Sequence, residues 1–304
     1  MTVPFEIGVV NGEVSSDIDE GVDFAASVGT SGIELVDFWG KPAWQADDGL
    51  LQRARLAVEC GGILVSAVGT DAFKRLELPA GAFRSLESID GWEKHSERFD
   101  GGLHAAQVLG ATKVRVFSCR RDGMSGAGNP SPRFPDGGPV PHDRLTTVAA
   151  ILHDVGDRAE AVGITVVVEN VRSCWGNTAI NTALILSLVN HPNVHMLWDP
   201  SNDVVFGGDG YPDVYQSARP WVEHVHIKDA RVVDLEAGRT AWECVGQGEV
   251  DFIGQFDALI GDGFTGAVSL ETHWCPIGQS RVESSRASLA GLCTAIDQIG
   301  RRSG

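Results

Sequence analysis

Short apolar runs alternate along the whole chain with longer stretches in which apolar residues recur at helical spacing. Amphipathic stretches of this kind predict helices, for example over residues 17–29, 95–110, 142–163 and 280–300. The apolar runs are rich in Val, Ile and Leu and predict eight β-strands, over residues 5–10, 32–38, 62–69, 113–118, 164–170, 194–199, 222–229 and 267–273. Strands that alternate with helices from end to end are typical of βα units around a parallel sheet.

Eight strands with eight following helices are the number that closes a (β/α)8 TIM barrel, and 304 residues are enough for one. No linker interrupts the series, so we predict a single α/β barrel domain over residues 1–304. One connection is anomalous, because residues 120–141 are rich in Gly, Pro and Ser and follow the fourth predicted strand. A long loop at that end of a barrel is typical of a lid over the site, with a disordered insert as the alternative.

The charge of the chain excludes some classes of partner. It has 24 Lys and Arg against 41 Asp and Glu, a formal net charge of −17 that repels nucleic acids and anionic membranes. The six cysteines form no CxxC pair, which argues against a zinc ribbon or a disulfide scaffold. The N-terminus lacks a leader segment, and no window approaches the ~18 apolar residues of a membrane span. We therefore expect a cytoplasmic protein without nucleic-acid or membrane partners.

Four ionisable residues stand at the carboxyl ends of four consecutive predicted strands, namely Glu169, Asp199, His226 and Glu271. Active sites of this barrel form at that end. Three carboxylates that converge in a site of low dielectric repel one another unless a cation neutralises them. Oxygen ligands with one imidazole and no thiolate favour Mn²⁺, Mg²⁺ or Co²⁺, with Zn²⁺ as an alternative. We predict one divalent metal ion, Mn²⁺ in the first place; four unrelated salt-bridging residues are the alternative.

Other polar residues on the last two strands are candidate substrate contacts. Because side chains alternate across a strand, His224, His226 and Lys228 share one face. His224 is expected deeper in the barrel as a hydrogen-bonded interior residue. Lys228 is expected nearer the mouth, where its ammonium could hold a substrate oxygen or stabilise an enolate. His273 shares the face of Glu271 one step further out and is a further candidate contact.

Residues on other segments complete the candidate substrate site. Glu34 on the second predicted strand and Arg115 on the fourth are expected either to face the substrate or to form a salt bridge inside the barrel. His142 follows the proposed lid and is a candidate contact for an anionic or polyhydroxy substrate. Indole rings stack well on the apolar faces of sugars, and three tryptophans follow strands two, five and eight: Trp39, Trp175 and Trp274. Packing beneath loops is the alternative for all three.

Six segments together resemble a known family: GIELVDF (32–38), VVVEN (166–170), MLWDPSN (196–202), HVHIKDA (224–230), VGQGEVDF (245–252) and SLETHW (269–274). They are similar to the xylose-isomerase-like barrel superfamily of sugar isomerases and epimerases, over essentially the whole chain. In that family the positions that match Glu169, Asp199, His226 and Glu271 bind one catalytic divalent ion, and the two glutamates also move protons. Ketose 3-epimerases and inosose dehydratases carry a histidine three residues after the aspartate, where this chain has Asn202, a candidate substrate contact.

The resemblance implies a metal-dependent sugar isomerase or epimerase that removes a proton beside a carbonyl of a ketose or keto-sugar through an enediolate. Lyases of the same superfamily are the alternative, either the barrel subunit of a 3-keto-C-glycoside deglycosidase or an inosose-type dehydratase. A non-catalytic sugar-binding barrel is a further hypothesis. The apurinic endonucleases of this superfamily would need a basic face, which the net charge of −17 opposes.

The expected partner is a small sugar or glycoside. A homo-oligomer and a complex with a partner subunit both stay open, because no helical stretch stands out in the sequence with an exposed apolar face.

Overall fold

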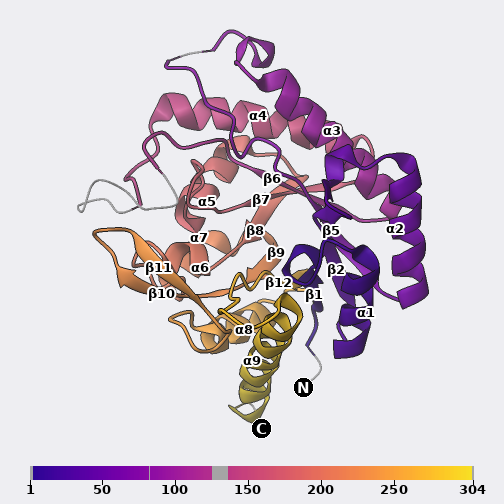
Figure 1. Ribbon diagram of the computed structural model, residues 1–304. Coiled ribbons are helices and arrows are strands. Elements are labelled where there is room, and N and C mark those ends of the chain that lie inside the picture. The colour runs from indigo at the N-terminus through magenta and orange to yellow at the C-terminus, as the bar shows by residue number, and fades with distance from the viewer. Residues whose placement is uncertain (1–2, 82, 125–135, 303–304) are drawn as a thin grey trace.

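The computed structural model describes residues 3–81, 83–124 and 136–302, and its centre is a closed barrel of eight parallel strands (Figure 1). Each barrel strand pairs with the next one along the chain, and the last pairs with the first. The barrel strands are β1 (Glu6–Val10), β2 (Gly32–Leu35), β5 (Leu64–Gly69), β6 (Lys113–Phe117), β7 (Thr165–Glu169), β8 (Val194–Trp198), β9 (Val222–Ile227) and β12 (Ala267–Leu270). The predicted (β/α)8 TIM barrel is therefore confirmed.

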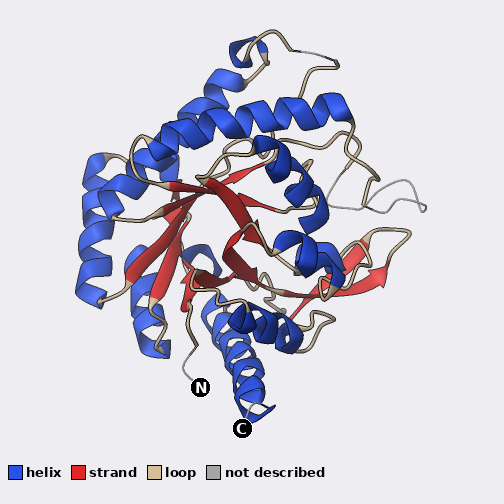
Figure 2. Cartoon of the chain, turned by 180° about the vertical axis from the view of Figure 1, so that it is seen from behind, coloured by secondary structure: helices blue, strands red, loops and turns tan. Residues whose placement is uncertain are grey.

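Helices surround the strands on the outside of the barrel (Figure 2). They are α1 (Ile18–Val28), α2 (Asp48–Gly61), α3 (Trp92–Leu109), α4 (His142–Glu160), α5 (Ala179–Val189), α6 (Ser201–Val204), α7 (Asp213–Ala218), α8 (Phe252–Gly261) and α9 (Arg281–Arg302), with short 3-10 helices η1 (Asn11–Glu13), η2 (Ala43–Gln45) and η3 (Leu86–Ser88). Their apolar residues pack on the strands and form one continuous core with them. Local sequence sets the helix ends: Asp17 caps the first amides of α1, and Gly29 ends that helix in the left-handed conformation.

Three predicted strands, the second, seventh and eighth, end two or three residues earlier than expected, and the second and seventh are each followed by a small antiparallel ribbon. The second leaves the barrel at Leu35, after which β3 (Asp37–Phe38) pairs with β4 (Lys41–Pro42). The seventh ends at Ile227 and continues into a hairpin, in which β10 (Asp229–Asp234) pairs with β11 (Arg239–Glu243). This hairpin projects beside the barrel (Figure 1) and was not predicted, because most of its residues are partly or fully exposed and carry no apolar run.

The proposed lid, residues 120–141, falls only partly within the described structure, since residues 125–135 lie outside it. Arg121 is buried and donates a hydrogen bond to Asn177 Oδ1 at 3.1 Å. His142 is the exposed first residue of α4. The lid function of the connection stays a prediction.

The interior of the barrel carries charged side chains where such barrels usually hold branched apolar ones. Glu34 on β2, Arg115 on β6 and His224 on β9 are all buried. Arg115 Nη1 lies 3.7 Å from Glu34 Oε1, so these two residues form an ion pair inside the barrel. His224 Nε2 lies 2.9 Å from Ser269 Oγ, which makes it a hydrogen-bonded interior residue.

One helix departs from the expectation that no helix exposes an apolar face. On α5, Ile180, Leu184 and Leu188 follow one another at one-turn spacing and are 51%, 44% and 45% exposed. Sequence periodicity does not reveal this stripe, because the buried side of α5 is equally apolar and the helix has no charged residue. Within the described residues, none of the helices combines the length and the apolar composition needed to cross a bilayer.

The loop after β5 is fixed by His95 of α3. The backbone N–H of Phe73 donates to His95 Nδ1 at 2.9 Å, and Phe73 adopts a φ of 65°, in the left-handed region. Burial, with a smaller contribution from Arg98, lowers the pKa of His95 to about 4. The imidazole therefore stays neutral near pH 7 and keeps its acceptor nitrogen.

Gly69, the last residue of β5, leaves room for the ion pair inside the barrel. A Cβ at this position would lie 2.4 Å from Val36 Cγ1, 3.0 Å from Arg115 Nη2 and 3.1 Å from Glu34 Oε1. We predict that Gly69→Ala lowers the free energy of unfolding by about 1–3 kcal/mol, measured by urea denaturation. Gly261→Ala is the matched control, since a Cβ there meets nothing within 4 Å. Equal unfolding midpoints in the two variants would contradict this account.

The pKa of His95 also predicts a pH dependence of stability. Its folded value of about 4 lies below the 6.5 of an ordinary histidine, so its stabilising effect is complete above pH 6.5 and is lost as the pH falls towards 4. Between about pH 7 and pH 5, we expect the free energy of unfolding to fall by about 2 kcal/mol more in the natural chain than in His95→Asn. Urea denaturation at each pH measures the difference, and parallel pH profiles would refute it.

Candidate metal and substrate site

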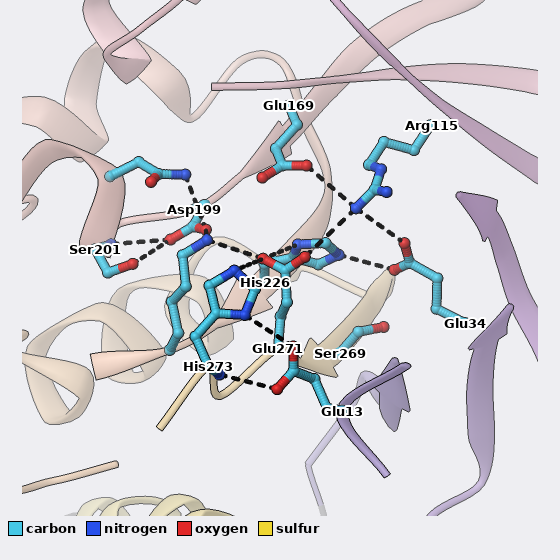
Figure 3. Close-up of polar contacts among 12 residues, drawn as sticks. Glu13, Glu34, Arg115, Glu169, Asp199, Ser201, His226, Ser269, Glu271 and His273 are labelled. Atoms are coloured by element: carbon cyan, nitrogen blue, oxygen red, sulfur yellow. Dashed lines mark hydrogen bonds and ion pairs between the residues drawn. The ribbon is translucent and has the colours of Figure 1, made fainter. Parts of the chain in front are cut away.

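Four side chains from consecutive barrel strands meet at the carboxyl ends of these strands (Figure 3). Glu169 is the last residue of β7, Asp199 follows β8, His226 lies in β9 and Glu271 follows β12. One ligand atom of each lies within 4.8 Å of the others, and all four residues are buried. The structure thus brings together the four residues that the sequence predicts as metal ligands.

His226 is oriented by Glu34, which reaches it from β2. His226 Nε2 lies 2.8 Å from Glu34 Oε2, and His226 Nδ1 faces Glu271 Oε2 at 3.4 Å. An imidazole with one nitrogen held by a carboxylate and the other turned to further carboxylates has the arrangement of a metal ligand. Burial alone would lower the pKa of His226, but Glu34 and Glu271 raise it well above its usual value. A bound cation would therefore compete with a proton at Nδ1.

Arg115 connects the carboxylates of three strands. Its Nη1 lies 3.3 Å from Glu169 Oε2, 3.5 Å from Glu271 Oε1 and 3.7 Å from Glu34 Oε1 (Figure 3). Burial alone would lower the pKa of Arg115, but these three carboxylates raise it. The guanidinium therefore stays charged, and it holds both glutamates of the four-residue group on one side.

Lys228 points into the site between two carboxylates. Its Nζ lies 2.6 Å from Asp199 Oδ2 and 2.8 Å from Glu271 Oε2. Burial alone would lower the pKa of this ammonium, but Asp199 and Glu271 raise it. Burial likewise opposes ionisation of Glu271, but Lys228 and His226 hold the pKa of Glu271 well below its usual range. Lys228 thus offsets part of the negative charge of Asp199 and Glu271.

Asp199 is held by the residues that follow it. Its Oδ1 accepts hydrogen bonds from the Ser201 hydroxyl at 2.6 Å and the Ser201 backbone amide at 3.1 Å. Its Oδ2 accepts one from Asn202 Nδ2 at 3.0 Å, and Asn202 also donates to the carbonyl of Asn170 at 2.7 Å. Asn202, the position where some relatives carry histidine, therefore positions a carboxylate as well as bordering the substrate space. Ser201 was missed, although the sequence Asp-Pro-Ser is typical of a turn in which a serine bonds to the preceding aspartate.

His273 is clamped by Glu13, a buried residue that the sequence analysis missed. His273 Nδ1 lies 2.8 Å from Glu13 Oε1, and the His273 backbone amide donates to Glu13 Oε2 at 3.0 Å. His273 has a φ of 51°, a conformation that is uncommon for a residue with a side chain and is found often at functional sites. Its Nε2 lies 3.8 Å from Glu271 Oε2. No sequence motif marks Glu13, which lies about 260 residues before its partner.

A cavity of about 390 Å³ opens beside the four-residue group. Lys228, Asn202 and His273 line it, together with Trp242 of the β11 strand. The Trp242 ring lies 5.4 Å from Lys228 Nζ and 5.3 Å, edge to face, from the His273 ring. Trp242 was missed because the hairpin that carries it was not predicted.

The three tryptophans expected at the mouth do not line this cavity. Trp39 lies under the guanidinium of Arg53 at 4.0 Å. Trp175 is buried, and the guanidinium of Arg121 lies 5.2 Å from its ring. Trp274 is partly buried beyond His273. These contacts favour the alternative expectation, packing, for Trp39 and Trp175, and a substrate contact by any of the three tryptophans stays a prediction.

A second group with metal-ligand residue types lies on the helical layer. His153, Asp157 and His191 offer ligand atoms within 4.8 Å of one another. The backbone amide of Asn193 donates to His191 Nδ1 at 3.0 Å, so the neutral ring carries its proton on Nε2 and donates it to Asp157 Oδ1 at 3.1 Å. A metal at Nε2 would require the other tautomer, with Nδ1–H facing an N–H donor. This group is therefore a hydrogen-bond network.

The four-residue group, by contrast, fits a hard divalent cation. Within the described chain, the buried atoms Glu169 Oε2 and His226 Nδ1 have no hydrogen-bond partner, although both face neighbouring charges. Three carboxylates and one imidazole are the donor set that Mn²⁺, Mg²⁺ and Co²⁺ accept. Asp199 and Glu271 are oriented by side-chain partners, as ligands usually are.

The chain belongs to the xylose isomerase-like TIM barrel family, whose sequence model matches residues 22–293. The resemblance inferred from the six sequence segments is therefore confirmed. No curated protein matches the chain by sequence.

Solved structures of this fold include sugar epimerases. The 3-keto-D-glucoside 4-epimerase YcjR from E. coli has a TM-score of 0.65 at 18% identity, over 95% of this chain and 99% of that one. D-allulose 3-epimerase from Methylomonas sp., in complex with D-allulose, has a TM-score of 0.69 at 18% identity, over 99% and 98%. A xylose isomerase-like TIM barrel/4-hydroxyphenylpyruvate dioxygenase fusion protein has a TM-score of 0.70 at 19% identity, and the match covers 98% of this chain but 44% of the fusion protein. At identities this low, the structural matches establish a shared fold and no more.

The ligand geometry predicts one high-affinity site for a divalent cation. We expect isothermal titration of the chelator-treated chain with Mn²⁺ to give one site, and Asp199→Asn to weaken it by about 100-fold or more, since loss even of an outer-shell partner costs about 10–100-fold. His153→Gln is the matched control, because its hydrogen-bond network excludes a metal. Unchanged Mn²⁺ affinity in Asp199→Asn, or an equal loss in His153→Gln, would argue against the assignment.

Proposed function

We propose that the chain is a divalent-metal-dependent sugar isomerase or epimerase that removes and returns a proton beside a carbonyl of a ketose or keto-sugar. The observation that carries this proposal is the placement of two buried glutamates, Glu169 and Glu271, with Asp199 and His226 between them around the barrel. Carboxylates on two sides of a substrate can take a proton from carbon and return one. Membership of the xylose isomerase-like family and the fold shared with two sugar epimerases support the reaction class.

In this proposal the residues divide into three roles. Glu169, Asp199, His226 and Glu271 hold the cation, which when bound polarises a substrate carbonyl and makes the adjacent C–H more acidic. Glu169 and Glu271 also move the proton. Arg115 holds both glutamates in position, because its guanidinium contacts a carboxylate oxygen of each.

The cavity residues bind and orient the sugar. Trp242 offers an indole face for a sugar ring, and His273, fixed by Glu13, presents Nε2 towards Glu271. Asn202 and Lys228 border both the cavity and the carboxylates, so a bound sugar that fills the cavity reaches the reacting groups.

A proton-exchange experiment tests this function. We expect the Mn²⁺-loaded chain in D₂O to place deuterium beside the carbonyl of one substrate class among ketoses, inososes and 3-keto-glucosides. NMR detects the deuterium. Glu169→Gln and Glu271→Gln should each reduce the exchange rate by about 10²–10⁴-fold, the usual contribution of general acid–base catalysis. Glu59→Gln, on the exposed side of α2, is the matched control.

The product separates the candidate activities. An epimer or a ketose–aldose pair identifies an epimerase or isomerase, whereas loss of a substituent identifies the lyase alternative, which shares the proton removal. Exchange that persists in both glutamine variants would refute the assigned roles. Absence of exchange with metal bound would refute a stand-alone enzyme and favour a barrel that needs a partner subunit.

A further inference from the structure

The cavity beside the four-residue group is basic, although the chain is strongly acidic. Of its ten lining residues, the ionisable ones are Lys74, Arg172, Lys228 and His273, and none is Asp or Glu. The chain as a whole has 41 Asp and Glu against 24 Lys and Arg. A concave site lined by one sign of charge concentrates ligands of the opposite sign.

Two of these basic residues are already engaged in the site described above. Lys228 Nζ is held between Asp199 and Glu271, and His273 is held by Glu13. The two others, Lys74 and Arg172, lie on the connections after β5 and β7.

Lys74 presents an ammonium with no ion-pair partner among the described residues. Its Nζ lies over the Phe117 ring at 4.5 Å. The acidic residues nearby pair with other cations, Asp71 with Arg98 and Glu77 with Arg120. The loop is rigid, because the preceding residue, Phe73, is fixed by His95, and the Lys74 carbonyl accepts a hydrogen bond from the Cys174 thiol at 3.7 Å. A lysine held in this way is prearranged for a ligand rather than for a surface ion pair.

The contacts of Arg172 include an aromatic ring and a backbone carbonyl. Its guanidinium lies over the Phe206 ring at 5.3 Å, and Nη2 donates to the Val205 carbonyl at 3.4 Å. Burial lowers the pKa of this guanidinium, yet arginine remains charged at neutral pH. Guanidinium groups fit the oxygen pairs of carboxylates and phosphates.

We propose that Lys74 and Arg172 form an anion subsite, so that the substrate of the proposed reaction is a keto-sugar with a carboxylate or a phosphate. This proposal rests on the proposed function, which places the carbonyl end of the substrate at the four-residue group. The cavity joins the two ends, because Asn202 and Lys228 line it and also contact Asp199. The carbonyl lies at the four-residue group, the sugar passes beside Trp242, and the anionic group reaches Lys74 and Arg172.

The first test measures the binding affinity for an anion, which does not depend on turnover. Isothermal titration of the Mn²⁺-loaded chain uses two probes, inorganic phosphate and the keto-sugar acid 5-keto-D-gluconate. We expect saturable binding of at least one of them. Lys74→Gln and Arg172→Gln should each weaken it about tenfold or more, the usual effect of losing a hydrogen bond to a charged group. Arg75→Gln is the matched control, because this exposed residue carries the same charge one position further along but lies outside the cavity.

The kinetic test compares matched sugars in the deuterium-exchange assay. D-Fructose, D-fructose 6-phosphate and D-fructuronate share one configuration and differ in the group at C6, which is a hydroxyl, a phosphate or a carboxylate. The preferred sugar therefore identifies the chemistry of the anionic group. We expect kcat/KM at least tenfold higher for an anionic sugar than for fructose, with this advantage lost in Lys74→Gln. Exchange on fructose with no preference for either anion, or anion binding unchanged in both variants, overturns the subsite and leaves the proposed function intact. Anion binding that depends on Lys74 and Arg172 without exchange supports the subsite and counts against the proposed function.

Discussion

Several carboxylates lie close together inside one barrel, and the rest of the site depends on how the repulsion between them is relieved. Glu34, Glu169, Asp199 and Glu271 are all buried, and an uncompensated buried charge costs several kcal/mol. Arg115 and Lys228 contact these four groups and supply two positive charges. With His226 neutral, these four carboxylates and two cations have a formal net charge of −2, which the two positive charges of a divalent cation would offset.

The same electrostatic need explains why so many contacts lie behind the four-residue group and the residues that line the cavity. Asp199 is fixed by a serine and an asparagine, His226 by Glu34, and His273 by Glu13. Each contact holds one polar atom of a ligand or cavity residue and leaves another turned to the site. Such support keeps reacting groups within a fraction of an ångström of their working positions, which loops alone do not achieve. The barrel strands carry the four central residues for this reason.

The sequence predicted the barrel and the four central residues because both follow from strictly local patterns. Strand runs end in Glu169, Asp199, His226 and Glu271, and parallel strands bring their carboxyl ends to one face. The contributions of Glu13, Lys74 and Trp242 could not be predicted, since they lie on connections whose path is set by packing. Lys228 lines the cavity, as expected of a residue near the mouth, but its ion pairs with Asp199 and Glu271 could not be predicted. Which loop side chains reach a site depends on tertiary structure, which periodicity does not encode.

The hydrogen bond between Glu34 and His226 joins residues 192 positions apart in the chain. During synthesis, the first strands emerge long before the strand that carries His226 exists. Until then Glu34 can pair inside the barrel with Arg115 only, and a buried carboxylate with one partner is poorly compensated. Contacts of such long sequence separation also slow folding. Glu34 therefore gains its imidazole partner only in a chain whose last barrel strands have already joined the first.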